Sequence, residues 1–362
     1  MPADENQQLV ERGGAAQALR ALQLSASPLL PRTLKRRLSR VHAEWTSRRV
    51  HAQLAALASG SEPIVAGPWL GEVGFELLYW IPFLAWFVER FDVPPERMVI
   101  VSRGGTRDWY AHLASHYRDV FDHVTPAEFR ARNDQRSAEL GEQKQIAATA
   151  FDRRLLAPVL AELGVAPDRV LHPSLMFRVF RPYWWRHLDS TWVGRHARFR
   201  TLSVSPEAEL LSRLPPDYVA VKFYYNDSFP ATDTNRLFAR DLLRGLRERG
   251  PIVSLSTGLA IDDHEGWEEE ETLAAHGIRA DLSPANNLRL QTLIVANARE
   301  WVGTYGGFAY LAPFHNVSAT AYFSNPDGFS KRHLALAQEV FARLSPSPLL
   351  TLHDVLGETV VE

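Results

Sequence analysis

A repeated strand, loop and helix pattern constrains the fold of this chain more than any other feature of its sequence. Short apolar runs recur, and most are followed by a glycine-bearing or polar loop and then by a helical segment. The predicted strands are Pro63–Gly67, Met98–Ser102, Val165–Leu171, Tyr218–Tyr224, Pro251–Ser256, Ile278–Asp281, Trp301–Val302 and Ser318–Phe323. Strands separated by helices at this spacing are typical of βαβ units with parallel sheets. The sequence therefore predicts an α/β fold.

The pattern runs through two similar halves of the chain, which meet near the Pro215-Pro216 pair. The predicted helices are 75–91, 147–163, 235–249, 268–276, 288–298, 308–315 and 331–344. Residues 172–200 are aromatic and basic and have no clean periodicity. Two doubly wound halves in tandem place the carboxyl ends of strands and the amino ends of helices around a cleft. Such helix ends offer unpaired N–H groups and partial positive charge, which suit a phosphate.

Composition excludes several classes of protein. The 362 residues include no cysteine, which excludes disulfides, thiolate zinc sites and a cysteine nucleophile. An apolar content of 46% and a net charge of −2 exclude a disordered chain and argue against a nucleic-acid binder acting through its whole surface. Neither a nicotinamide-type GxGxxG motif with its acidic partner nor the phosphate-binding GxxxxGK[ST] motif is present. We therefore expect an enzyme of another kind.

The amino-terminal segment is basic, unlike the rest of the chain. Residues 11–52 hold nine lysines and arginines and two glutamates, a net charge of +7, so the remainder carries −9. Leucines 34 and 38, Val41 and Trp45 follow a helical spacing. This helix either packs on the main body or lies through residues 32–49 on an anionic membrane surface. The polar, acidic start of the chain differs from a secretory signal, so we expect a cytoplasmic protein, with peripheral association at the inner face of the membrane as an alternative.

Three stretches resemble the GT-B glycosyltransferases and are most similar to the bacterial heptosyltransferase type. In the first, a glycine turn precedes Glu76, which lies six positions before Pro82. The second is a strand that runs into the polar loop 222–236, and the third is the helix, strand and glycine turn within 288–323. The resemblance implies two Rossmann-like doubly wound domains (GT-B) that face each other across a cleft, with an N-terminal helical extension.

The resemblance also implies a division of the chain by role. The expected parts are a basic helical extension over 1–60, an acceptor domain over 61–205, a nucleotide-sugar donor domain over 206–330, and a closing helix and tail over 331–362. Sugar transfer needs a base for the acceptor hydroxyl and positive groups for the departing diphosphate. The resemblance makes Glu76 the first candidate for this base and Glu72 the second. If the helix begins by residue 72, the two share a face and their like charges raise one pKa; the alternative is that one or both cap the helix.

The donor site is expected in two segments of the second half. The candidates in the first segment are Lys222, Tyr224, Asn226, Asn235 and Arg236. Lys222 is a charge inside an apolar strand, which either points to water or reaches the donor phosphates. Asp233 or Thr234 is expected to cap the next helix. Arg236 in its first turn is unfavourable for the helix dipole unless an anion lies nearby, so it is a phosphate candidate.

A glycine turn forms the second donor segment. Its candidates are Thr304, Tyr305, Gly306 and Gly307. Consecutive glycines allow positive φ and let a ligand touch the backbone, although the same pair is common in plain turns. Thr257 and Gly258, after the predicted strand 251–256, are candidates for the nucleoside pocket.

Trp184 and Arg181 are the acceptor-binding candidates, because aromatic faces stack on sugar rings and arginines suit an anionic acceptor. Packing in the core or between domains is the alternative for the tryptophan. Asp262, Asp263 and His264 suggest a divalent metal, but adjacent residues rarely converge on one ion. The resemblance implies a metal-independent enzyme, so we predict no metal ligand and no cofactor beyond the nucleotide sugar as co-substrate.

The sequence thus predicts a glycosyltransferase that moves a sugar from a nucleotide-diphosphate donor to a cell-surface glycan or a related, lipid-linked acceptor. Inversion at the sugar carbon is expected, with a glutamate as general base. Two alternatives stay open: a nucleotide-sugar epimerase, and a non-catalytic sugar- or nucleotide-binding protein on the same scaffold. No nucleic-acid partner is predicted.

Overall fold

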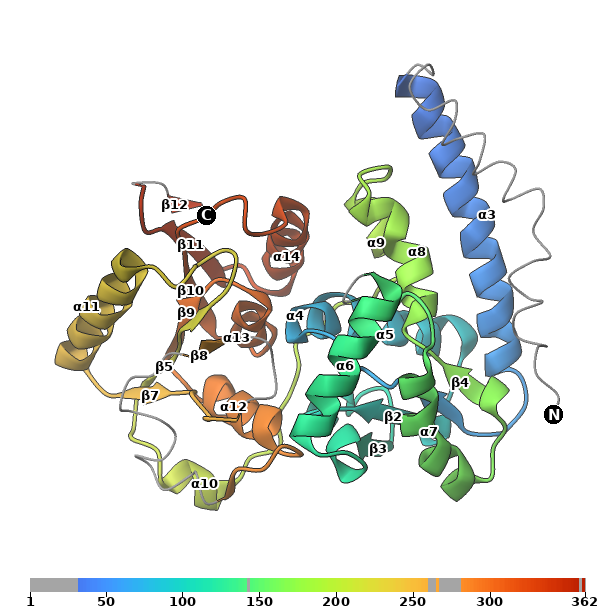
Figure 1. Cartoon of the computed structure of the whole chain (residues 1–362), viewed down its shortest axis with the longest axis horizontal. Coiled ribbons are helices and arrows are strands. Elements are labelled where there is room, and N and C mark those ends of the chain that lie inside the picture. Colours follow the sequence, from blue (N-terminus) through green and yellow to red (C-terminus); the bar gives the residue numbers. More distant parts are fainter. Residues whose placement is uncertain (1–31, 142–143, 260–264, 267–280, 358–359, 362) are drawn as a thin grey trace.

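The computed structural model describes residues 32–141, 144–259, 265–266, 281–357 and 360–361. It has a mixed α/β architecture with two separate main sheets (Figure 1), which confirms the α/β part of the predicted fold class and is compatible with Rossmann-like domains. The predicted helix 268–276 and all but the last residue of the predicted strand 278–281 lie outside the described residues.

The first sheet has four parallel strands in the order β3-β2-β1-β4. These strands are β1 (Ile64–Ala66), β2 (Met98–Ser102), β3 (His116–Asp119) and β4 (Val170–Leu171). Strands β1 and β2 are buried along their whole length, as expected for a parallel sheet with both faces covered. The sequence predicted β1, β2 and β4 but missed β3.

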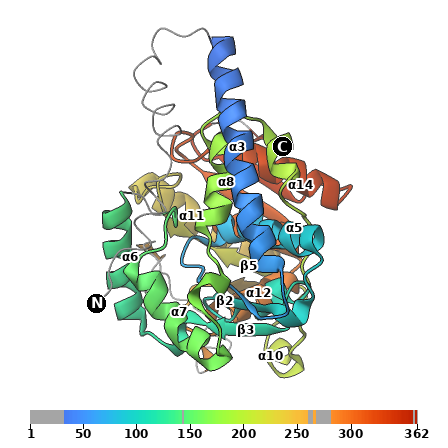
Figure 2. The same ribbon diagram turned by 90° about the vertical axis from the view of Figure 1, so that its right-hand side faces the viewer.

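Helices of the first half come before, between and after these strands. They are α3 (Arg32–Ala58), α4 (Val73–Phe75), the π-helix η1 (Glu76–Trp80), α5 (Ile81–Phe91), α6 (Pro126–Leu140), α7 (Ala150–Leu163), α8 (Ser174–Trp184) and α9 (Ser190–Gly194). Short 3-10 segments are η2 (Pro95–Arg97), η3 (Thr106–Tyr110), η4 (Val120–Asp122) and η5 (Pro167–Arg169). Helix α3 runs alongside α8 and extends past the body of the molecule (Figures 1 and 2). The aromatic stretch 172–200, which gave no periodicity, nevertheless contains α8 and α9. Helix α8 buries most of its side chains, including Leu175, Phe177 and Phe180, and leaves Arg178 exposed.

The second sheet has the order β12-β11-β10-β9-β5-β7, and all its pairs are parallel except β11 with β12. Its strands are β5 (Val219–Lys222), β7 (Ile252–Ser254), β9 (Glu300–Thr304), β10 (Ser318–Phe323), β11 (Leu350–Asp354) and β12 (Val360–Val361). A separate antiparallel pair joins β6 (Tyr224–Tyr225) to β8 (Glu265–Gly266). The helical segments are α10 (Ala208–Ser212), α11 (Asp233–Arg249), α12 (Asn287–Ala296), η8 (Gly307–Tyr310), α13 (Leu311–Phe314) and α14 (Lys331–Leu344).

Two local predictions in the second half need correction. Helix α11 is capped by Thr232, whose hydroxyl accepts a hydrogen bond from the Asn235 N–H at 3.2 Å, and not by Asp233 or Thr234. The expected tail after α14 instead supplies β11, which pairs in parallel with β10, and β12. The predicted helix 331–344 is confirmed with its bounds, and its buried face carries Leu334, Ala337 and Val340.

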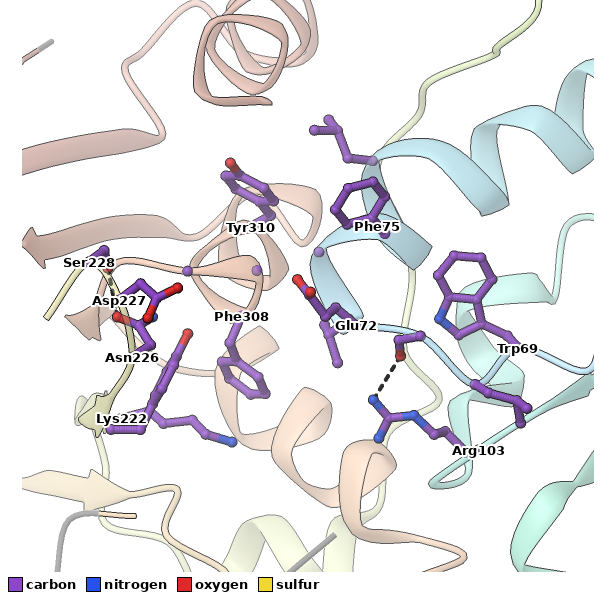
Figure 3. Close-up of a pocket in the computed structure, with 18 of the residues that line it drawn as sticks. Trp69, Glu72, Phe75, Arg103, Lys222, Asn226, Asp227, Ser228, Phe308 and Tyr310 are labelled. Carbon is purple, nitrogen blue, oxygen red and sulfur yellow. Dashed lines mark hydrogen bonds between the residues drawn. The ribbon is translucent and has the colours of Figure 1, made fainter. Parts of the chain in front are cut away.

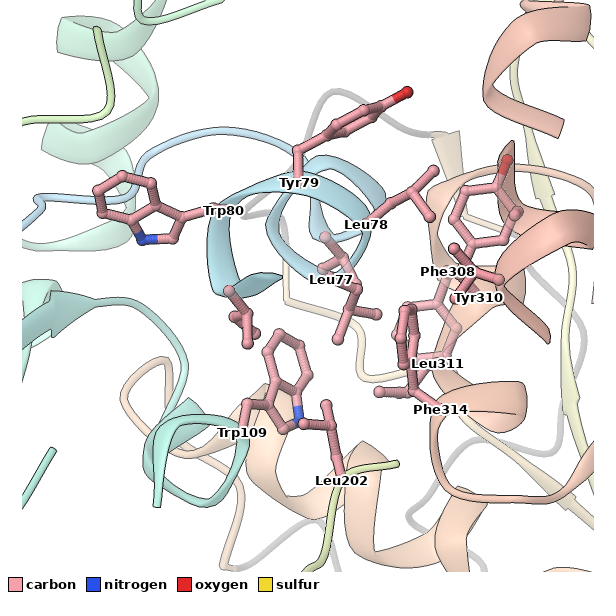
Figure 4. Close-up of a cluster of buried hydrophobic side chains, with 14 of the residues drawn as sticks. Leu77, Leu78, Tyr79, Trp80, Trp109, Leu202, Phe308, Tyr310, Leu311 and Phe314 are labelled. Carbon is pink, nitrogen blue, oxygen red and sulfur yellow. The ribbon is translucent and has the colours of Figure 1, made fainter. Parts of the chain in front are cut away.

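One hydrophobic cluster joins the two halves. Leu77 and Leu78 of the π-helix lie beside Leu311 and Phe314 from α13 in this cluster (Figure 4). All four side chains are at most 2% exposed. The segment between α9 and α10 also contacts the second half, because the Leu202 N–H donates to the Phe314 carbonyl at 2.7 Å. The halves are therefore packed together through a shared core as well as facing the cleft described next.

Candidate functional site

A cleft of about 1020 Å³ is lined by residues from both halves of the molecule (Figure 3). From the first half come the turn 69–75, Arg103, and residues of α6, α8 and the loop before α7. From the second half come 222–228, 255–259, the turn 305–308 and the start of the α14 region. The carboxyl ends of β5, β7 and β9 open onto this cleft, as expected for ligand sites in parallel sheets.

Lys222 lies at the carboxyl end of β5 and lines the cleft. Its ammonium donates to the side-chain oxygen of Gln291 at 2.5 Å and lies 3.9 Å from the ring centroid of Phe308. The side chain therefore does not simply point to water, which was the alternative from the sequence. It is half-buried and held at the cleft wall, where its charge faces any anion bound there.

Hydrogen bonds connect the loop after β5 to the turn after β9. The Thr304 hydroxyl donates to the Tyr224 carbonyl at 2.8 Å and accepts from the Tyr224 N–H at 3.1 Å. The Asn226 amide and the Ser228 hydroxyl both donate to the Tyr305 carbonyl, at 3.1 and 2.7 Å. Tyr224, Asn226 and Tyr305 line the cleft, whereas Thr304 is fully buried behind them. Thr304 thus positions this wall and does not contact a ligand.

Contrary to our expectation, Gly306 and Gly307 do not adopt positive φ. Glycine is needed at these two positions because neighbouring atoms leave no room for a Cβ. Gly306 has an extended φ of 176°, and Gly307 does not lie in the left-handed region. A Cβ on Gly306 would lie 2.2 Å from the Tyr224 hydroxyl, and one on Gly307 would lie 2.6 Å from the Gly74 nitrogen. A Cβ on Gly74 would in turn lie 2.4 Å from the Gly307 Cα. The glycine turns of the two halves therefore meet backbone to backbone at the cleft.

The two candidate glutamates have opposite surroundings, although they are four residues apart. Glu72 is exposed, lines the cleft, and stands at the N-cap position of α4 with an extended backbone (φ −66°, ψ 148°). Among the described residues, its side chain makes no capping hydrogen bond to this helix. Because the helix begins only at Val73, Glu72 does not share a helical face with Glu76. Figure 3 shows Glu72 projecting into the cleft toward the wall that carries Asn226.

Glu76 is fully buried and is not among the residues that line the cleft. One carboxylate oxygen, Oε1, accepts hydrogen bonds from the Ser102 hydroxyl at 2.6 Å and from the Tyr110 hydroxyl at 2.5 Å. Burial raises the pKa of Glu76 to about 7, although the two hydroxyls and Arg103 act in the opposite direction. This burial argues against Glu76 as the base for an acceptor hydroxyl, because such a base must reach the hydroxyl directly or through one water.

Arg103 is a cleft residue that sequence reasoning missed. It follows β2 directly, is 3% exposed, and donates from Nη2 to the Gly71 carbonyl at 2.9 Å. Figure 3 draws this hydrogen bond, which ties the turn before α4 to the carboxyl end of the sheet. Arg103 directly follows a strand that the sequence predicted, and this position at the carboxyl end of a parallel strand could have identified it as a cleft residue. The glycines after it have positive φ, with 74° at Gly104 and 77° at Gly105, as a sharp turn requires.

Aromatic residues form one end of the cleft. Phe75 and Tyr79 line it together with His333 from α14, and the Tyr79 hydroxyl lies 2.6 Å from Nδ1 of His333. Burial, with help from nearby cations, lowers the pKa of His333 to about 3, so the imidazole is neutral. Trp184 lies behind this end, with its ring centroid 5.7 Å from that of Phe75 and 5.1 Å from that of Tyr79. Lys144, also missed, lies 5.3 Å from the Phe75 ring and 5.5 Å from the Trp184 ring.

The remaining predicted site residues divide into two groups. Thr257 and Gly258 line the cleft, as the nucleoside-pocket hypothesis requires. Asn235, Arg236, Arg181 and Trp184 do not line it. The Asn235 amide donates to the Pro230 carbonyl at 2.7 Å and to the Ser324 hydroxyl at 2.8 Å, so its role is to hold the start of α11. Arg236 is exposed and lies 4.9 Å from the Tyr225 ring, and Arg181 lies 3.8 Å from the Trp185 ring.

Asp262, Asp263 and His264 lie outside the described residues. Within the described part of the chain, no group of three or more histidine, aspartate or glutamate side chains is arranged to hold a metal ion. None of the described helices combines the length and the apolar character that crossing a membrane requires. Compared with known proteins, the chain matches no family model and no curated protein.

Proposed function

We propose that this protein is a GT-B type glycosyltransferase that uses a nucleotide-diphosphate sugar. The main support is the cleft itself, where a cation at the end of one parallel sheet and the amide-rich Gly306-Gly307 turn face an exposed glutamate from the other half. Its volume of about 1020 Å³ is at the upper end of what small-molecule sites occupy, which leaves room for a nucleotide sugar and part of an acceptor.

In the proposed reaction, Glu72, the second candidate from the sequence, is the general base in place of Glu76. Its carboxylate accepts the proton of the acceptor hydroxyl, whose oxygen then bonds to the anomeric carbon of the sugar. The bond from that carbon to the diphosphate oxygen breaks, and the electron pair leaves with the diphosphate. Lys222 and the N–H groups at the Gly306-Gly307 turn stabilise the negative charge on this leaving group. Thr257 and Gly258 border the part of the cleft proposed for the nucleoside.

The first test is a panel of nucleoside diphosphates in thermal-shift and calorimetric titrations. A bound nucleotide should raise the melting temperature, and Lys222→Met should reduce this rise when each protein is compared with its own unliganded form. Sugar donors that carry the nucleobase of the most stabilising nucleotide are then tested for sugar transfer. The wild-type protein, Glu72→Gln and Glu76→Gln are assayed side by side. If no nucleotide stabilises the wild-type protein at millimolar concentration, the donor-site proposal is wrong.

The same assays separate the two alternatives. An epimerase converts the nucleotide sugar without any acceptor, so product that forms in the absence of acceptor supports that function. A non-catalytic protein binds the nucleotide sugar but leaves it intact, with Glu72→Gln changing affinity only. Loss of transfer in Glu72→Gln with unchanged donor affinity supports the transferase.

A further inference from the structure

We propose that the outward face of α3, with the neighbouring end of α8, docks on an anionic lipid bilayer. This inference is independent of the proposed function, because it concerns a surface outside the cleft. Among the described residues, five large apolar side chains are exposed, and three of them lie on these two helices or directly after α8. They are Val41 at 68%, Trp45 at 44% and Trp185 at 53% exposure.

Helix α3 has two distinct long faces. Ala43, Val50 and Leu54 are at most 1% exposed and pack on the body. Val41 and Trp45 lie on the opposite side, because residues four apart share a helical face. Exposed arginines of α3 include Arg37, Arg48 and Arg49, which flank this outward face, and Arg40, which lies nearer the packed face. An exposed valine and tryptophan among arginines combine apolar surface with positive charge, the two contributions that drive binding to an anionic bilayer surface.

Both exposed tryptophans carry an arginine against the ring. The Arg49 guanidinium carbon lies 4.7 Å from the Trp45 ring centroid, and that of Arg181 lies 3.8 Å from the Trp185 ring centroid. In each pair, an apolar ring and a cation would therefore lie at the same depth in a bilayer interface. Tryptophan rings prefer the level of lipid headgroups, and arginine forms charge-assisted hydrogen bonds with their phosphates. The pairs therefore favour a bilayer surface over a purely polar polyanion.

The two tryptophans lie on or directly after two neighbouring helices. Helices α3 and α8 lie side by side in both views (Figures 1 and 2), and Arg195, just after α9, pairs with Glu44 of α3 at 3.2 Å. Trp184, the neighbour of Trp185, packs against Phe75 and Tyr79 at the aromatic end of the cleft. A bilayer bound to this face would therefore adjoin that end of the cleft.

Vesicle co-sedimentation of the full chain tests the proposal. The protein should bind vesicles of phosphatidylcholine with phosphatidylglycerol much more tightly than vesicles of phosphatidylcholine alone, and added salt should weaken the binding. Each cation near an anionic surface is worth about fivefold in affinity. We therefore expect Arg37→Ser, Arg40→Ser, Arg48→Ser and Arg49→Ser together to lower the affinity at least about 100-fold. Trp45→Ser with Trp185→Ser, which leaves the charge unchanged, should lower it by about tenfold or more.

Helix α11 provides matched controls. Besides Arg236, it carries four further exposed arginines, Arg240, Arg244, Arg247 and Arg249, and an apolar side chain, Leu237, at 55% exposure. Serine at these four arginines, or at Leu237, should leave vesicle binding within about threefold of wild type, and circular dichroism and melting curves check that every variant folds. Three results would overturn the proposal: no preference for anionic vesicles at low salt, an equal loss in the α11 variants, or self-association through Trp45 in place of vesicle binding.

Discussion

The two walls of the cleft are held in place by different means. The wall from the second sheet is fixed by hydrogen bonds among its own polar groups, such as those from Asn226 and Ser228 to the Tyr305 carbonyl. The wall from the first sheet is the start of a helix, and the turns after it are buried in apolar packing around Glu76. The first arrangement suits a preformed anion site, and the second presents the exposed carboxylate of Glu72 on a rigid support.

The largest effect should come from exchanging the two glutamates in turn. Glu72→Gln is expected to lower kcat for sugar transfer about 10²–10⁴-fold, because a general base contributes that much. Its affinity for the nucleoside diphosphate, measured by calorimetry, should stay within about threefold of wild type. Glu76→Gln keeps a buried hydrogen-bonding group and should retain transfer. The reverse ranking would show that Glu76 reaches the substrate.

The buried carboxyl group of Glu76 should make the stability of the protein depend on pH. Because burial raises the pKa of Glu76 from 4.5 to about 7, the folded protein binds a proton more tightly than the unfolded chain. Stability from this group is therefore complete below about pH 4.5 and is lost as the pH rises to about 7. The loss amounts to as much as about 3 kcal/mol.

Urea unfolding of wild type and Glu76→Gln at several pH values isolates this effect. The difference in the free energy of unfolding between the two proteins should change in favour of the variant as the pH rises from 5 to 8. A difference that is constant across this range would mean that Glu76 is ionised at a normal pKa in the folded protein.

Removing the Lys222 charge tests whether the wall from the second sheet binds an anion. Lys222→Met keeps the stem of the side chain against Phe308 but removes the charge. A hydrogen bond to a charged group contributes about 1.5–3 kcal/mol, so nucleoside diphosphate affinity should fall about 10–100-fold. Affinity for the uncharged nucleoside should change much less, and calorimetric titration of both ligands checks this contrast.

The two walls approach each other closely at Gly74 and Gly307, so this contact should not tolerate a side chain at either position. Gly307→Ala forces a Cβ to within 2.6 Å of the Gly74 backbone nitrogen. Overpacking of this kind costs about 1–3 kcal/mol of unfolding free energy. Gly245→Ala is the matched control, because it lies in α11 with open space around it and should stabilise the helix by up to about 1 kcal/mol. Equal effects of the two substitutions in urea unfolding would contradict the close contact.

Strands were predictable where the sheet buries them, and were missed where it does not. Strand β2 is apolar up to its final serine and is buried throughout, so its bounds were predictable from the sequence. Strand β3 reads His-Tyr-Arg-Asp and is buried only at Asp119, so it carries no apolar signal. Pairing with β2 defines β3 as a strand, and this pairing is a long-range property.

The candidate site was predictable as a set of loops more than as a set of side chains. The loop after β5 and the turn after β9 line the cleft because the carboxyl ends of parallel strands share one edge of a sheet. Within these loops, Asn235 and Thr304 were expected to contact a donor but hold the backbone instead. Lys144 reaches the cleft from a loop that has no motif, so its position depends wholly on how the helices pack.

The sequence by itself determined that the chain forms an α/β fold with parallel sheets. The reason is that local apolar patterns indicate both the buried strands and the spacing of the helices. It also determined that glycine and polar loops follow the strands that border the cleft. Only the tertiary structure decided that Glu72, and not Glu76, projects into that cleft. The reason is that the helix begins at Val73 and continues as a π-helix, so the direction of each side chain depends on backbone geometry and on packing against the other half.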